Sequence, residues 1–270
     1  MTIPEHLLPD ENDSRLRVGA RPLVVTQWVS EIDEQWQQNI DLKKWLLANQ
    51  HDEVVGCVAD NDVACEEAAR GIADSLGLVT EKKCRGIDAL EQVVAQIADD
   101  VCILTIDSDS TLVLSAAVLC APNRWLLADK LGKPMDVVHA PVARYDTDLA
   151  RPVDSFLNRL AVDRPMWRTN WGIVNDPMFF QPRIAAVTPN INAGDLLMRV
   201  EYQTLRRLPV SGAVMFTIRT FQEQLSDLVT RVPRMASVLT QLIDQLPDNV
   251  AAYKSISPYR AALIKWCSQH

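Results

Sequence analysis

The grouping of strand-like segments constrains the fold of this chain more than any other sequence feature. Apolar runs at 101–106 and 111–119 flank a turn-forming stretch, Asp107–Ser110, which is the pattern of a β-hairpin. Three more strand-like segments follow, at 166–174, 195–205 and 212–221. Strands grouped in this way favour an antiparallel sheet in an α+β fold over a parallel βαβ array.

Helical periodicity accounts for most of the remaining chain. Helices are predicted at 28–48, 63–76, 87–98, 125–131, 154–161, 225–246 and 251–266. Asp62 and Asp88 are predicted to cap the second and third of these helices, and Gly77 to end the second. The first hundred residues are therefore expected to be mostly helical.

The order of these elements suggests three regions. We expect a helical region at 1–98, a sheet core at 99–222 with short helices over one face, and C-terminal helices at 223–270. Two strands, several short helices and three strands is also the element order of the PAS fold, which holds haem or flavin between its helices and its sheet. A shared element order is an association with PAS domains and not by itself evidence of function.

Charge and hydropathy exclude several function classes. The net charge of -8 argues against nucleic-acid binding through a broad basic surface. No apolar run reaches the roughly 18 residues of a membrane span. The first residues carry no basic segment followed by an apolar block, so we expect no secretory signal and a cytoplasmic location.

The chain carries no motif for a nucleotide or a cysteine-bound metal. There is no Gly-x-Gly-x-x-Gly and no P-loop. The six cysteines contain no Cys-x-x-Cys pair and are irregularly spaced, so a zinc or iron–sulfur site is poorly supported and reduced thiols are expected.

One histidine stands out by elimination. Of the four histidines, two lie at the termini and one in a polar run, whereas His139 lies mid-chain, close to Pro141. A lone histidine is more often a hydrogen-bonded structural residue than a ligand. A neutral imidazole next to a rigid proline also suits an axial metal or haem ligand. Spacing alone leaves both interpretations open.

The last three strands carry alternating polar residues. Alternation places Arg168 and Asn170 opposite Trp171. In the next strand one face carries Arg199, Glu201 and Gln203, and in the third one face carries Thr217 and Arg219. Such faces are often solvated in an antiparallel sheet. The alternative is a pocket face, where buried charges such as Arg199, Glu201 and Arg219 would need partners and would mark a functional site.

Several spaced motifs resemble one known family. The motifs are Asn123–Trp125, His139–Val142, Pro152–Asp154, Arg164–Trp171, Arg199–Pro209 and Phe216–Thr220, with a matching start at Leu16–Leu23 and a matching end at Tyr253-Lys and Tyr259-Arg. In this order they resemble the haem-dependent oxidative N-demethylase family, and more narrowly its α subunit, the dimethylamine monooxygenase catalytic chain. The resemblance covers most of the sequence.

The resemblance implies a PAS-like haem enzyme. Such an enzyme oxidises a small secondary amine with O₂ and NADPH-derived electrons, giving a primary amine and formaldehyde. It implies haem b on this chain, and FMN, a 2Fe–2S centre and folate on reductase and folate-binding partner subunits. The lack of a dinucleotide motif and of clustered cysteines fits that division.

The resemblance also assigns roles to individual residues. His139 is expected to be the proximal haem ligand. Arg219 and Glu201 are expected on the distal side with Arg199 nearby, where a guanidinium stabilises charge on oxygen and a carboxylate anchors an alkylammonium. Cofactor contacts are expected from Arg124 and Arg168, which suit haem propionates, and from Tyr145, Asn170 and Trp171.

Two departures from the family pattern concern the substrate. Ala143 replaces a second proline after the histidine, and Tyr202 replaces an arginine in Glu-x-Gln. Both leave His139 and Glu201 in place but put the identity of the amine in doubt. The alternatives are a PAS-type haem sensor of gas or redox state and a non-catalytic interaction subunit with the same fold.

Overall fold

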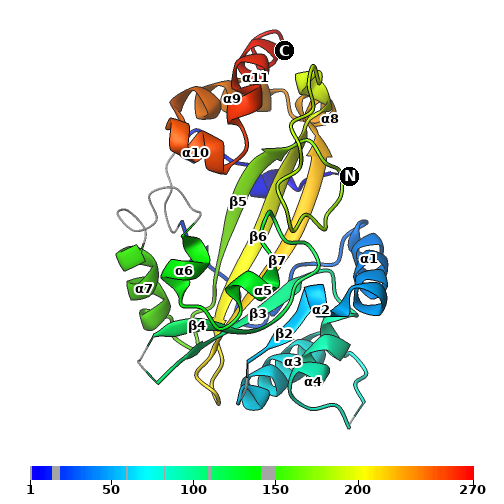
Figure 1. Ribbon diagram of the computed structural model, residues 1–270, viewed down its shortest axis with the longest axis vertical. Coiled ribbons are helices and arrows are strands. Elements are labelled where there is room, and N and C mark those ends of the chain that lie inside the picture. Colours follow the sequence, from blue (N-terminus) through cyan, green and yellow to red (C-terminus); the bar gives the residue numbers. More distant parts are fainter. Residues whose placement is uncertain (1, 14–18, 59, 82, 109–110, 141–149) are drawn as a thin grey trace.

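One antiparallel sheet of seven strands organises the described residues, which are 2–13, 19–58, 60–81, 83–108, 111–140 and 150–270 of the computed structural model (Figure 1). The strand order is β1-β5-β6-β7-β3-β4-β2. The strands are β1 (Arg21–Pro22), β2 (Val55–Cys57), β3 (Asp100–Ile106), β4 (Leu112–Val118), β5 (Met166–Val174), β6 (Leu197–Arg207) and β7 (Val214–Gln224).

The predicted α+β class is confirmed, together with all five predicted strands. β5 has its predicted bounds, and β6 and β7 each begin two residues later than expected. The predicted hairpin is the pair of β3 and β4. The edge strands β1 and β2 were not predicted, because two and three residues are too short to display alternation. Both come from the first 98 residues.

Helices surround the sheet. They are α1 (Trp36–Asn49), α2 (His51–Val54), α3 (Asp62–Leu76), α4 (Gly86–Val94), α5 (Leu127–Lys130), α6 (Met135–His139), α7 (Ala150–Arg159), α8 (Leu225–Arg231), α9 (Arg234–Gln245), α10 (Asp248–Tyr253) and α11 (Arg260–Cys267). None of these described helices combines the length and apolar character that crossing a membrane requires.

The helix predicted at 28–48 is only partly correct. Helix α1 begins at Trp36, and the segment before it is irregular. Tertiary contacts hold that segment in place. The Ser30 backbone N–H and hydroxyl donate to the buried Asp99 carboxylate at 3.0 and 2.6 Å, and the Trp28 ring lies under the Arg206 guanidinium at 4.4 Å. These contacts outweigh the helical periodicity, which is a weak preference.

Several helix boundaries also differ from prediction. Gly77 ends α3 at φ +65°, as predicted, but the N-caps of α3 and α4 are Asn61 and Arg85, not the predicted aspartates. The helix predicted at 225–246 is broken into α8 and α9 around Pro233, which has no N–H to donate. The last predicted helix is likewise divided into α10 and α11.

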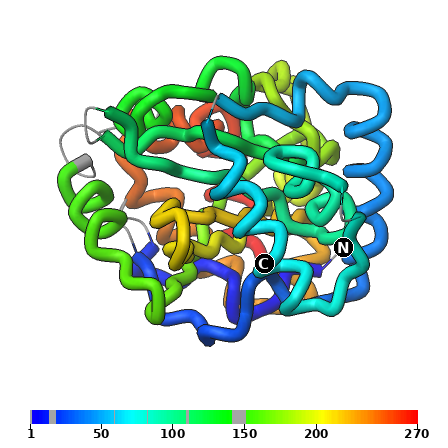
Figure 2. Tube along the Cα trace, turned by 90° about the horizontal axis from the view of Figure 1, so that it is seen from below, coloured from blue at the N-terminus to red at the C-terminus, as the bar shows by residue number. Residues whose placement is uncertain are grey.

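The two faces of the sheet are covered by different helices. At one end of the first face α1, α3 and α4 pack on β3 and β4, and at the other end α8–α11 pack on β5–β7. The short helices α5, α6 and α7 cover the second face, as predicted. Figure 2 shows α7 and α1 on opposite sides of the molecule. The second face is the one that carries a cavity.

Candidate functional site

A largely apolar cavity lies between the second face of the sheet and helices α5–α7. Its volume, counted as the space that the centre of a water molecule can reach, is about 270 Å³. Its apolar walls include Leu104, Leu114, Met135, Phe156, Leu205, Phe216 and Ile218. Its polar lining consists of Asn123, Arg124, Lys130, His139, Arg168, Asn170, Glu201, Gln203 and Tyr253. An apolar cavity with a few converging polar groups is the usual form of a ligand site.

The strand register explains why these polar residues meet. β5 and β6 pair Arg168 with Gln203 and Asn170 with Glu201. Directly paired residues point to the same face, so all four side chains lie on the cavity side. The alternation of polar residues therefore marks a pocket face and not a solvated one. Glu201 itself is 8% exposed.

His139 lies on the cavity wall at the end of α6. Its Nδ1 hydrogen-bonds the Met135 carbonyl oxygen at 2.8 Å, one helical turn back. An acceptor at Nδ1 requires the proton there, which leaves the lone pair on Nε2. Burial lowers the pKa of His139, and the nearby Arg168 charge lowers it further, against the opposing effect of the Met135 bond. The imidazole is therefore neutral at pH 7 and able to bind a metal.

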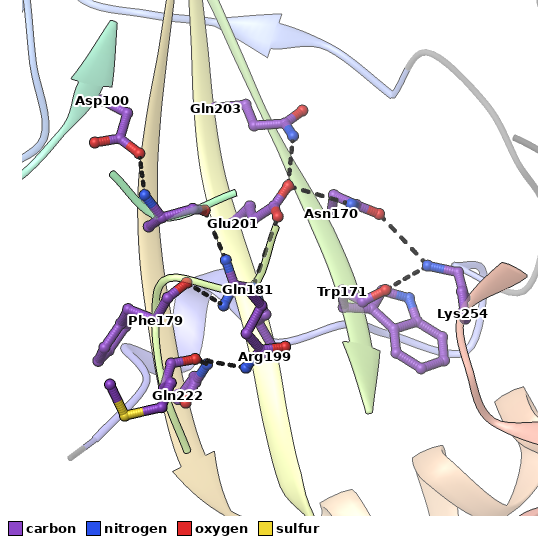
Figure 3. A network of polar contacts seen from close by, with 12 residues as sticks. Asp100, Asn170, Trp171, Phe179, Gln181, Arg199, Glu201, Gln203, Gln222 and Lys254 are labelled. Atoms are coloured by element: carbon purple, nitrogen blue, oxygen red, sulfur yellow. Dashed lines mark hydrogen bonds and ion pairs between the residues drawn. The ribbon is translucent and has the colours of Figure 1, made fainter. Parts of the chain in front are cut away.

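Glu201 is held by amide and guanidinium groups (Figure 3). Its Oε2 accepts from Gln203 Nε2 at 2.9 Å and from Asn170 Nδ2 at 3.3 Å. Its Oε1 lies 3.8 Å from Arg199 Nε. A carboxylate has about four lone-pair sites, so these contacts leave it capacity for a further donor.

Arg199 is fixed from behind by backbone carbonyls. It is 1% exposed and donates to Ala121 O at 2.8 Å and to Phe179 O at 3.2 Å. The Ala121 N–H donates in turn to Asp100 at 2.7 Å, and Asp100 pairs with Lys43 of α1 at 3.1 Å. Arg199 is not among the cavity-lining residues. It contacts Glu201, so its predicted catalytic role becomes a supporting one in our proposal.

The polar cluster of Asn170, Arg199, Glu201 and Gln203 has a further neighbour that was not predicted, Lys254, which directly follows α10. Lys254 Nζ donates to the Trp171 carbonyl and lies 3.4 Å from Asn170 Oδ1. Its neighbour Tyr253 lines the cavity. The sequence identifies Tyr253-Lys254 only as a motif shared with the family. Lys254 lies more than 80 positions after the two β5 residues that it contacts, and local sequence patterns do not show which distant residues will meet.

Two arginines give the cavity a positive rim. Arg124 and Arg168 line it, and the Nε of each is buried without a hydrogen-bond partner. Burial lowers the pKa of both guanidinium groups. A buried donor without a partner costs free energy, so an anionic group in the cavity could be bound by both arginines. Arg124 also has a positive φ of +65° and donates to Ser255 Oγ.

Two predicted site residues lie on the other face of the sheet. Arg219 pairs with Tyr202 in the register, so it points away from Glu201. It is 0% exposed and binds both oxygens of Asp33, at 2.8 and 3.0 Å, beside the Phe221 ring. The prediction that Arg219 shares the pocket with Glu201 is therefore wrong, because residues one position out of step face opposite ways.

Trp171 likewise packs in the core formed with the C-terminal helices, so its ring does not line the cavity. Only its carbonyl takes part in the cluster, through Lys254. Tyr145 lies outside the described residues, and its predicted cofactor contact stays a prediction.

Metal ligands are sparse in the part of the chain that the structure describes. No group of three or more His, Cys, Asp or Glu side chains there has metal-binding geometry. An iron atom at His139 would need its other ligands from a tetrapyrrole. The apolar walls, the neutral imidazole and the partnerless arginine nitrogens fit such a group with two carboxylates. A second hollow, between α9 and α11, contains none of the predicted site residues.

Comparison with known families agrees with this geometry. The family model described as "Haem-dependent oxidative N-demethylase, alpha subunit-like" matches residues 75–264, more than two thirds of the chain. The match runs from the end of α3 into α11 and includes every cavity-lining residue. The chain therefore belongs to the haem-dependent oxidative N-demethylase, alpha subunit-like family.

Proposed function

We propose that this chain is the haem b-binding catalytic subunit of a monooxygenase that removes a methyl group from a small secondary amine such as dimethylamine. The amine, O₂ and two reducing equivalents would give a primary amine, formaldehyde and water. The observation that carries the proposal is that His139, bonded through Nδ1 to the Met135 carbonyl, and the buried Glu201 line one largely apolar cavity.

Each part of the cavity has a task in this proposal. His139 would hold the iron through Nε2, and Arg124 and Arg168 would pair with the propionates. The likeness to PAS domains belongs to the same proposal, with the haem between α5–α7 and the sheet. When bound, the haem would supply O₂ activation.

Glu201 would bind the substrate. An alkylammonium resembles the lysine head group, which donates to carboxylates, and the buried position of Glu201 strengthens that attraction. Arg199, Asn170 and Gln203 would hold the carboxylate in one direction. Glu201 could then accept the ammonium proton at a carboxylate oxygen.

Electrons would have to come from other chains. The described cysteines form no cluster that could hold a 2Fe–2S centre. By resemblance to the family, we propose that FMN, the iron–sulfur centre and folate lie on partner subunits and that the assembly is cytoplasmic.

The first test is the haem spectrum of a histidine variant. We expect His139→Ala to lose the Soret band and most bound haem after reconstitution. The matched control is His51→Ala, because His51 is half exposed and bonds Glu91 away from the cavity. Unchanged haem content and an unchanged Soret band in His139→Ala would refute the ligand assignment.

The second test is turnover. With a reductase added, wild-type protein should release formaldehyde from dimethylamine, and Glu201→Gln should lower kcat/KM by at least about tenfold through loss of the charge pair. A haem spectrum without formaldehyde release would favour a sensor over an enzyme. The absence of haem binding in wild-type protein would favour a non-catalytic subunit.

A further inference from the structure

We infer that Lys254 is a positioning residue that orients the Asn170 amide and, through it, directs the Glu201 carboxylate into the cavity. The inference rests on the proposed function for what Glu201 binds. The contact between Lys254 and Asn170 is a separate claim with its own test.

The Lys254 side chain approaches β5 from the side opposite β6 (Figure 3). Among the described residues, β1 pairs with β5 only at Met166 and Trp167. The connection between α10 and η4 (Ser257–Tyr259) lies on this side of β5. A Cβ added at Gly172 would lie 3.8 Å from the Lys254 carbonyl oxygen, which shows how closely the two backbones approach.

Lys254 is buried and bonded to neutral acceptors. It is 8% exposed, donates to the Trp171 carbonyl, and lies 4.5 Å from the centroid of the Trp171 ring. It also donates to Asn170 Oδ1 at 3.4 Å. A buried ammonium is costly and needs such partners, and the ring face adds a cation–π contribution.

An ammonium group selects one orientation of the neighbouring amide. Lysine can only donate while protonated, so it draws the Asn170 oxygen toward itself. The Asn170 nitrogen then faces Glu201 Oε2, at 3.3 Å. The flipped amide would set donors against the ammonium and an oxygen against the carboxylate. Two unfavourable contacts would replace two favourable ones.

The same contacts make the arrangement sensitive to pH. Burial lowers the pKa of Lys254 to about 8, with Arg168 lowering it and Glu201 and Asp13 raising it. These are the charged groups that face Lys254 from β5, β6 and the N-terminal segment. Above about pH 8 the neutral amine can accept as well as donate, so Lys254 no longer favours one Asn170 orientation and only the bond to Glu201 still does.

The direct test follows the Asn170 side-chain amide by NMR in the protein without added cofactor, with Asn170→Ala assigning the signals. In wild-type protein we expect the two amide proton shifts to titrate near pH 8. In Lys254→Met they should not titrate, whereas in the control Lys265→Met, which removes an exposed lysine of α11, they should. Asn170 amide shifts at pH 6.5 that are the same in a folded Lys254→Met variant as in wild-type protein would overturn the inference.

The functional test is a double-mutant cycle on dimethylammonium binding, measured by calorimetry on haem-loaded protein. Lys254→Met should weaken binding about tenfold in wild-type protein and change it less than twofold in Asn170→Ala. Equal losses in both backgrounds would show that Lys254 does not act through Asn170. If wild-type protein does not bind dimethylammonium, the proposed function fails, and the amide signals still decide the role of Lys254.

Discussion

Arg199 of β6 and Arg219 of β7 are both fully buried but differ sharply in their partners, and their removal should have unequal effects on stability. Arg199 donates to two backbone carbonyls and lies 3.8 Å from Glu201. Replacing it with methionine leaves those oxygens and a buried carboxylate without a cation. Removing one partner of a buried pair costs about 3–5 kcal/mol, and we expect a loss in that range for Arg199→Met.

Arg219 is equally buried but has fewer hydrogen-bond partners. Its Nε and Nη1 have none, and the side chain of Asp33, with which it pairs, is 29% exposed and can be hydrated once the arginine is gone. Removing one member of an ion pair costs less when the remaining charge can be solvated than when it stays fully buried. We therefore expect Arg219→Met to cost about 1 kcal/mol or less.

Urea denaturation followed by circular dichroism measures both variants. With a urea m-value of about 3 kcal/mol/M, the Arg199→Met midpoint should fall by about 1–2 M and the Arg219→Met midpoint by less than about 0.5 M. An Arg219→Met loss equal to or larger than the Arg199→Met loss would refute the reasoning from partners.

Three further outcomes can be measured on the isolated protein. Gly71→Ala should lower stability by about 1–3 kcal/mol in thermal denaturation, because its Cβ would lie 2.1 Å from the Trp28 ring; an unchanged melting temperature would contradict this. His139 has a lowered pKa in the folded state, so the unfolded chain binds more protons below about pH 6.5 and stability falls there. Wild-type protein should therefore lose more stability than His139→Gln between pH 7.5 and 5 in urea titrations, and parallel losses would count against a neutral buried imidazole. Burial raises the pKa of the Cys65, Cys102 and Cys120 thiols. Mass spectrometry should therefore find these three unalkylated by iodoacetamide until the protein unfolds, and rapid labelling of the native protein would contradict this.

Local sequence predicted the bounds of an element best where one strong pattern was not opposed by long-range contacts. β5 has its predicted bounds because its alternation and flanking residues agree, and Gly77 ends α3 because only a left-handed residue suits that position. The helix predicted to begin at residue 28 failed because Ser30 and Trp28 make long-range contacts that periodicity does not register.

The sequence by itself determined the α+β class, the order of the five main strands, and which residues on each strand share a face. It also singled out His139 by elimination and Glu201 by alternation, and motif matching gave both a role. The tertiary structure decided which polar residues meet, since the pairing of β6 with β7 sends Arg219 away from Glu201. It also brought in Lys254, more than 80 residues along the chain from Asn170. Alternation has a period of two and says nothing about how one strand is aligned with the next. That alignment, and the approach of Lys254 to β5, are set by packing of the whole chain.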